Sequence, residues 1–161
     1  MIVNDVLDLA ITYNGNDAKR INHLLKVFSL ASHIGIMENC DSRLQTIIEI
    51  SALLHDIGIH ESERKYNSAA GNWQEIEGPI VAQELLEDLS LENDILERVL
   101  FLIGHHHSYN AVDGIDFQIL VEADFLVNIF EDKIEKTGCV KLKETIFKTK
   151  TGIKLLEQLY M

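Results

Sequence analysis

The chain has 161 residues and a formal net charge of −12, with 14 Lys and Arg against 26 Asp and Glu. The length is typical of one domain, and the hydrophobic fraction of 47% excludes a disordered chain. The negative charge disfavours nucleic-acid polymers and anionic membranes as partners, because both would be repelled. A small phosphorylated ligand remains compatible with it, since a local cation can override the global sign.

The location is predicted from the cysteines and the N-terminal stretch. Cys40 and Cys139 are far apart and form no CxxC pair, which favours a reducing compartment and so a cytoplasmic protein. Asp5 and Asp8 interrupt the first apolar stretch, so we expect no secretory leader. No apolar run approaches the roughly 18 residues of a membrane span.

The first three predicted elements are helices. Residues 2–13 are amphipathic, and residues 18–38 carry apolar side chains at three- and four-residue spacing. Asp41 or Ser42 can cap the third helix, which is apolar on nearly every side, and Gly58 is well placed to end it. Such a helix is expected to be central and buried.

The rest of the chain is also mainly helical. Residues 58–73 are polar and weakly periodic, so we expect a loop there, and loops of this length are often functional. Further helices are predicted at 75–89, 92–104, 116–130 and 139–160. We therefore predict an all-α fold of about seven helices, with residues 1–161 as a single domain. The C-terminal helix at 139–160 can pack on the domain or on a second copy, which would give a homodimer.

The pair His55-Asp56 at the end of the third helix is the strongest sign of chemistry. Its neighbours are apolar, and a carboxylate there is costly unless something pairs with it. A divalent cation would satisfy both side chains, because imidazole and carboxylate are common ligands of Zn, Fe and Mn. Adjacent helical residues point about 100° apart, so they can meet one ion only near a helix end.

Three further positions fit the same chemistry. His23 lies inside the second helix, and Asp124 shares a helical face with Leu120 and Val127. Three consecutive histidines follow the helix at 92–104. Each has a plainer interpretation: a hydrogen-bonded core histidine, a solvated carboxylate, or histidines that complement a helix C-terminus.

His23, His55-Asp56 and Asp124 form the ordered pattern H…HD…D, and with it the chain resembles the HD-domain superfamily of metal-dependent phosphohydrolases. The likeness covers residues 18–130. It is carried by the strings RINHLLKVFSLA, SALLHDIG, GPIVAQELLEDL, IGHHHS and ILVEADFLVNI. The resemblance implies that these four residues hold one divalent cation, which would be Mn, Fe, Co, Ni, Zn or Mg.

Some members of this family bind a second ion. His105 and His106 stand where such members carry a histidine pair, and Glu77 stands where many have another histidine. Glutamate can ligate a hard ion, so one ion and two ions both stay open, with Asp56 as the bridging carboxylate. The lysine of HDIGK and the GYP triplet of members that cleave cyclic dinucleotides are missing, so that activity is not expected.

The resemblance implies a hydrolase for a nucleotide or another small phosphoester, either a phosphomonoesterase or a phosphodiesterase. A metal-bound hydroxide would attack phosphorus, with Asp56 orienting it and Glu77 serving as general acid or base. Arg20 and Lys26 lie three residues on either side of His23, so both flank its helical face and can clamp a phosphate.

Two alternatives stay open. A di-iron oxygenase of the same fold would need ligands for two irons, including one at Glu77, and oxygen uptake with metal analysis would identify it. A non-catalytic ligand-sensing module would keep the fold without the reaction, although the complete H…HD…D set argues against it. Substitution of Asp56 without any loss of activity would favour that module.

Overall fold

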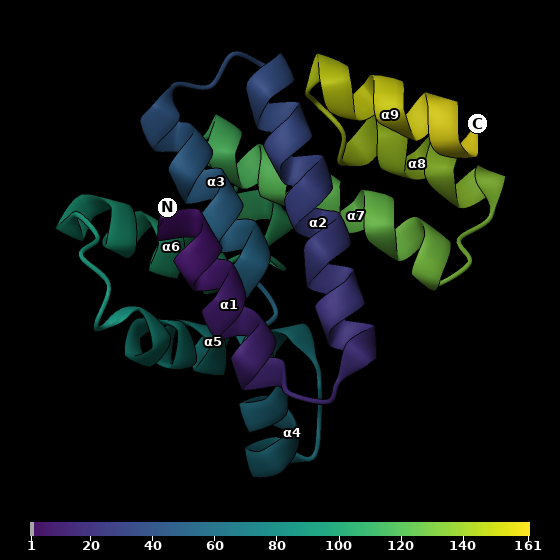
Figure 1. The fold of residues 1–161 in the computed structure, drawn as a ribbon. Coiled ribbons are helices and arrows are strands. Elements are labelled where there is room, and N and C mark those ends of the chain that lie inside the picture. The colour runs from purple at the N-terminus through teal and green to yellow at the C-terminus, as the bar shows by residue number, and fades with distance from the viewer. Residues whose placement is uncertain (1) are drawn as a thin grey trace.

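The computed structural model describes residues 2–161, and in that range it contains nine α-helices and one short 3-10 helix (Figure 1). The all-α prediction is confirmed, and residues 2–161 contain no strand. The helices are α1 (Ile2–Asn14), α2 (Ala18–Met37), α3 (Ser42–Leu54), α4 (Ile59–Tyr66), α5 (Gly71–Leu86), α6 (Asn93–Ile103), η1 (Tyr109–Ala111), α7 (Ile115–Glu131), α8 (Lys136–Thr145) and α9 (Lys150–Tyr160).

An aspartate caps the N-terminus of each of the next two helices, α2 and α3. The Asp17 carboxylate accepts the backbone N–H of Arg20 at 3.1 Å, and the Asp41 carboxylate accepts that of Leu44 at 2.8 Å. Each carboxylate thereby satisfies a backbone donor that has no partner inside its helix. Of the two residues predicted as the cap of α3, the structure uses Asp41.

The core lies among α2, α3 and α7. Helix α7 is buried along most of its length, and both α2 and α3 pack against it. Figure 1 shows α8 and α9 side by side next to α2 and α7, with α5 and α6 on the other side of the molecule. The C-terminal end of α3 therefore meets the second turn of α2 and the middle of α7 inside the protein. None of the helices in residues 2–161 has the length and apolar character needed to cross a membrane.

The polar segment at 58–73, expected to be a loop, begins with the short helix α4. Glu61 lies in its first turn and Arg64 and Lys65 in its last, which complements the helix dipole. Arg64 also pairs with Glu61 at 2.6 Å, three residues apart on the exposed side. Charge placement, rather than an apolar face, accounts for this helix, which is why apolar periodicity did not reveal it.

The C-terminal stretch expected as one helix at 139–160 is instead the helix pair α8 and α9. Phe147 is buried in the connection, and the Thr149 hydroxyl caps α9 by accepting the backbone N–H of Gly152 at 2.9 Å. The fully buried carboxylate of Glu122 on α7 accepts the backbone N–H groups of Lys148 and Thr149 at 2.6 and 2.9 Å. This carboxylate provides the hydrogen-bond acceptor for the backbone of the turn that separates α8 from α9.

Gly58 does not itself end α3, which stops at Leu54. A Cβ atom at Gly58 would lie 2.5 Å from the backbone nitrogen of Gly78 on α5, which is closer than real Cβ atoms approach. The glycine therefore lets the turn after His55-Asp56 pack directly on α5. This contact sets the position of Asp56.

Candidate metal centre

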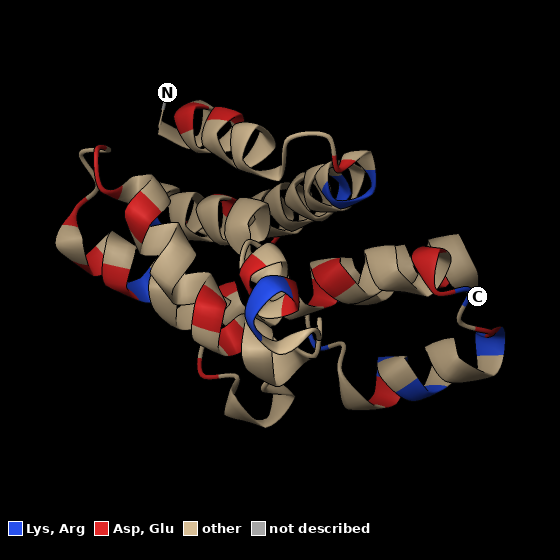
Figure 2. Cartoon of the chain, turned by 90° about the horizontal axis from the view of Figure 1, so that it is seen from below, with Lys and Arg blue, Asp and Glu red and all other residues tan. Residues whose placement is uncertain are grey.

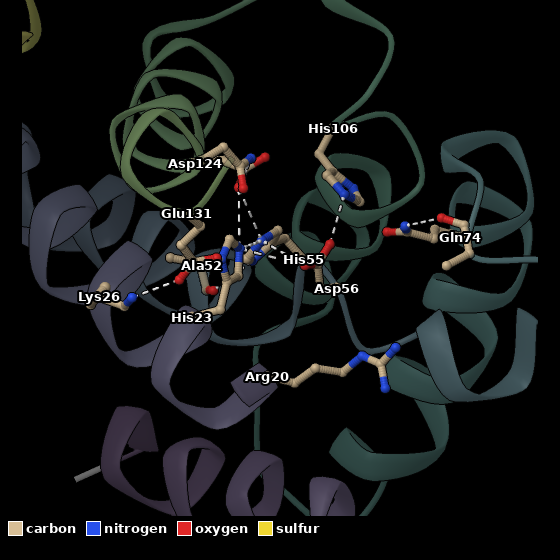
Figure 3. Close-up of polar contacts among 12 residues, drawn as sticks. Arg20, His23, Lys26, Ala52, His55, Asp56, Gln74, His106, Asp124 and Glu131 are labelled. Atoms are coloured by element: carbon tan, nitrogen blue, oxygen red, sulfur yellow. Dashed lines mark hydrogen bonds and ion pairs between the residues drawn. The ribbon is translucent and has the colours of Figure 1, made fainter. Parts of the chain in front are cut away.

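Four side chains from three helices converge in one buried cluster. His23 comes from the second turn of α2, His55 and Asp56 follow the end of α3, and Asp124 comes from α7 (Figure 3). The Nε2 atom of His23 lies 3.2 Å from Nε2 of His55 and 3.2 Å from Oδ1 of Asp124. Oδ2 of Asp56 lies 3.5 Å from both Nε2 atoms. The sequence pattern H…HD…D thus becomes a single site in space.

The donor atoms of this cluster suit a divalent cation. One atom each of His23, His55 and Asp56 lies within 4.8 Å of the others, and Asp124 Oδ1 lies 3.6 Å from His55 Nε2. Two imidazoles and two carboxylates form a donor set that Zn, Mn and Fe accept. Asp56 keeps 26% of its side chain exposed, whereas the other three are at most 10% exposed. Access to the cluster is therefore on the side of Asp56.

The Nδ1 atoms of the histidines point away from the cluster and have partners of their own. His23 Nδ1 lies 2.9 Å from Glu131 Oε2, and His55 Nδ1 lies 2.9 Å from the carbonyl oxygen of Ala52. Because a carboxylate and a carbonyl can only accept, Nδ1 carries a proton in each ring, and Nε2 is the atom that would offer its lone pair to a bound cation. Sequence reasoning did not identify Glu131, although it lies seven residues after Asp124 and so on the same face of α7.

The charges within the cluster support one another. Burial lowers the pKa of His55, but Asp56 and the hydrogen bond to Asp124 outweigh burial and raise it to about 9. Burial raises the pKa of Asp56, but His55 and His106 outweigh it and lower the value to about 2. The pKa of Asp124 also falls well below its usual range, because hydrogen bonds from His23 and His55 outweigh its burial. Both carboxylates are therefore ionised and attract positive charge.

A second group of donor atoms adjoins the first through Asp56. Donor atoms of Asp56, His106 and His107 lie within 4.8 Å of one another. His106 Nε2 is buried without a hydrogen bond and lies 3.4 Å from Asp56 Oδ1, while its Nδ1 lies 2.8 Å from the carbonyl oxygen of Ile103. An orphaned imidazole nitrogen that faces a carboxylate is a position a cation would satisfy.

The predicted histidine pair is shifted by one residue in the structure. His105, expected beside His106, points away: its Nδ1 lies 2.7 Å from the carbonyl oxygen of Phe101, and its ring stacks on Phe101 at 4.2 Å. His107 takes its place, because the backbone turns after α6 ends. Burial and the neighbouring His106 lower the pKa of His107 to about 4, which keeps its ring neutral. Gln74 Oε1, also missed from sequence, lies 3.2 Å from His107 Nε2.

Glu77 belongs to neither group of donor atoms. Its buried carboxylate accepts Lys65 Nζ at 2.6 Å and the Tyr66 hydroxyl at 2.8 Å. In the structure this carboxylate links α4 and α5, and the role as ligand or general acid–base stays a prediction. The ring of Tyr66 stacks on Trp73 at 3.9 Å, so these two aromatic side chains partner each other.

Of the two predicted phosphate-binding cations, only Arg20 lines the cleft beside the cluster. Arg20 lines a cleft of about 290 Å³ together with Lys19, His23 and Asp56, and Figure 3 shows its side chain reaching below Asp56. Its guanidinium donates to Asp17 at 2.6 Å and to Glu63 at 2.7 Å. Lys26 does not line this cleft and donates to Glu131 at 2.6 Å.

Comparisons with known proteins bear on the family and the fold of the chain. The family model described as "HD domain" matches residues 20–128. The chain is similar to the crystal structure of a predicted HD superfamily hydrolase from an uncultured Thermotogales bacterium, with a TM-score of 0.70 and 24% identity. That match covers 96% of this chain and 83% of the other, and it supports the shared fold. No curated protein matches the chain.

Proposed function

The chain belongs to the HD domain family, and from this membership we propose that it is a metal-dependent phosphohydrolase for a small phosphoester. The observation that supports the proposal most directly is the convergence of His23, His55, Asp56 and Asp124 beside a solvent-accessible cleft. Three buried donors and one partly exposed donor converge here, and burying such polar groups costs free energy unless a partner compensates. A divalent cation is the partner that their chemistry fits.

In this proposal His23, His55, Asp56 and Asp124 hold the cation. When bound there, a divalent cation would lower the pKa of a water molecule and offset the charge of the phosphoryl oxygens. Asp56 is the partly exposed member of the set. Its carboxylate is placed to orient a water molecule from the cleft and to accept a hydrogen bond from it.

The cleft also supports a small, phosphorylated substrate. Arg20 and Lys19 provide positive charge beside Asp56, and Asn128 and Asp132 add polar groups to the lining. A phosphate that displaces Asp17 or Glu63 from the Arg20 guanidinium would gain a bidentate partner. A cleft of about 290 Å³ has the size of a small-molecule site, and the net charge of −12 disfavours polymeric substrates.

A second cation is supported by Asp56, His106 and His107. We propose that the first group binds more tightly, because it offers two imidazoles and two carboxylates, whereas the second offers one carboxylate that is shared. Glu77 is not part of this second group, since Lys65 and Tyr66 already occupy its carboxylate.

The test is a screen of phosphorylated metabolites with Mn, Co, Ni, Fe, Zn and Mg in turn, with metal content measured for each sample. We expect hydrolysis with at least one metal, and loss of both metal and activity in His55→Ala and Asp124→Ala. His33→Ala is the matched control, since this histidine also lies on α2 but outside both donor groups. Full metal stoichiometry in the two site variants, or no hydrolysis of any phosphoester, would contradict the proposal.

A further inference from the structure

Positive and negative charges are segregated along the chain. Residues 1–132 contain seven Lys and Arg against 23 Asp and Glu, whereas residues 133–161 contain seven Lys against three Glu. In Figure 2, acidic positions dominate the ribbon except along α8 near the C-terminus. Among the described residues, six of the seven cations before residue 133 form ion pairs with carboxylates, and after it only Lys143 does.

Two of the unpaired lysines flank the start of α9, which contacts the end of α2 next to two exposed apolar residues. Lys148 and Lys150 are exposed at the start of α9, and Ile36 and Met37 at the end of α2 are 61% and 55% exposed. The backbone N–H and the hydroxyl of Thr151 donate to Glu38 at 2.8 and 2.6 Å, which fixes α9 against the residue that follows Met37. Figure 1 shows these two helix ends side by side. We call these four residues, Ile36, Met37, Lys148 and Lys150, the basic end.

A groove of complementary character lies between α5 and α6. It has a volume of about 480 Å³, and four leucines line it: Leu86, Leu89, Leu91 and Leu96. Glu84 and Glu87 also line it, both are exposed, and neither forms an ion pair within residues 2–161. We call it the acidic groove. An apolar floor with carboxylates at its rim matches an apolar patch flanked by lysines.

We propose that the acidic groove binds the basic end of a second copy of this chain. Parts of both surfaces lie near the start of α3: Ile36 and Met37 shortly precede its cap Asp41, and Arg43 pairs with Glu92, next to the groove residue Asn93. Two complementary surfaces of one protein can pair reciprocally about a two-fold axis. Such a dimer would contain the contact twice, which is the closed arrangement that most homo-oligomers use.

The same chain supplies both halves of this contact, which favours a second copy over another anionic partner. A nucleic acid would be attracted by the lysines but repelled by the acidic residues of the segment 1–132, and it would leave the groove empty. Two copies also repel each other over long distances, but at about 0.15 M salt the screening length is about 8 Å. Distant charges are then screened, whereas charges in direct contact keep most of their attraction.

The test is sedimentation or light scattering of the full chain at physiological salt, together with two charge-reversed double variants. We expect the unmodified chain to have twice the monomer mass of 18.3 kDa. Lys148→Glu with Lys150→Glu, and separately Glu84→Lys with Glu87→Lys, should each weaken the dimer roughly tenfold or more, since four ion pairs become repulsive. An equal mixture of the two variants should restore it, because each altered surface then meets an opposite charge.

The matched control is Lys133→Glu with Lys141→Glu, which makes the same charge change at two exposed lysines outside the basic end and should leave the dimer intact. All of these positions are exposed, and circular dichroism would verify the fold of each variant. A monomeric unmodified chain, or dimers that survive both reversals, would overturn the proposal. Tight binding of a labelled oligonucleotide that depends on Lys148 and Lys150 would likewise overturn it, by assigning the basic end to another partner.

Discussion

Glu131 Oε2 lies 2.9 Å from His23 Nδ1, and Glu131 Oε1 accepts Lys26 Nζ at 2.6 Å. The carboxylate fixes the proton of His23 on Nδ1 and thereby turns Nε2 toward His55 and Asp124. Lys26 in turn fixes the carboxylate. This chain of three residues explains why a lysine predicted to bind phosphate lies beside the site without lining its cleft.

We therefore predict that Glu131→Ala weakens metal binding by roughly 10–100-fold, because the His23 ring loses its orienting acceptor. Competition against a fluorescent chelator would measure the affinity. Lys26→Met should have a much smaller effect, since the Glu131–His23 contact survives in it. Unchanged affinity in the Glu131 variant would show that packing alone orients the His23 ring.

His106→Ala and His107→Ala should each reduce the metal bound beyond the first equivalent, because both rings supply donors to the second group. His105→Ala should leave metal binding unchanged, since its ring stacks on Phe101. Metal titration followed by elemental analysis distinguishes the three variants. Loss of metal in the His105 variant, with His107→Ala unaffected, would restore the pair predicted from sequence.

Glu77→Gln should change the pH dependence of stability. The hydrogen bond from Lys65 outweighs burial and, with that from Tyr66, lowers the pKa of Glu77 below its usual value. The ionised carboxylate thus stabilises the fold above the unfolded-state pKa of about 4.3, and this stabilisation is lost as pH falls through the lowered folded-state value. Urea unfolding at pH 7 should show a loss of about 1 kcal/mol in the variant, and the loss should shrink toward pH 3. A constant loss across this range would argue against a charged Glu77.

Gly58→Ala should destabilise the protein by about 1–3 kcal/mol, because the new Cβ would meet the Gly78 backbone at 2.5 Å. The same strain should weaken metal binding, since Asp56 lies two residues away. Gly104→Ala is a gentler comparison, as the nearest atom to its Cβ is a side-chain carbon of Pro79 at 3.1 Å. Thermal unfolding would rank the two variants, and equal losses would count against a special role for Gly58.

The sequence predicted the helices whose apolar faces form the core, and with them the residues that point inward. His23, His55 and Asp124 each interrupt an apolar helical face, and the resemblance to the family then singled them out as predicted ligands. The contacts of His105, Glu77 and Lys26 could not be predicted in this way, because they depend on distances between segments. Whether Glu77 faces a metal or Lys65 is decided by how α4 packs on α5, and local periodicity carries no information on that packing.

The turn at 146–149 was missed for a related reason. Its stabilising partner, Glu122, lies 26 residues before Lys148, inside a helix whose sequence gives no sign of a distant contact. A fully buried carboxylate that pairs with backbone N–H groups rather than with a cation cannot be predicted from the sequence, because those donors come from a distant segment.

Glu122 also determines how far the protein can be shortened. The family model ends at residue 128, yet Glu122 inside that span draws three of its hydrogen bonds from Lys148 and Thr149, and the Tyr160 hydroxyl donates to the carbonyl oxygen of Leu126 at 2.6 Å. A truncation at residue 128 would remove these hydrogen-bond partners of α7. Glu122, which would lose three of them, lies only two residues from Asp124. We accordingly expect the smallest autonomous unit to be longer than the span that the family model matches.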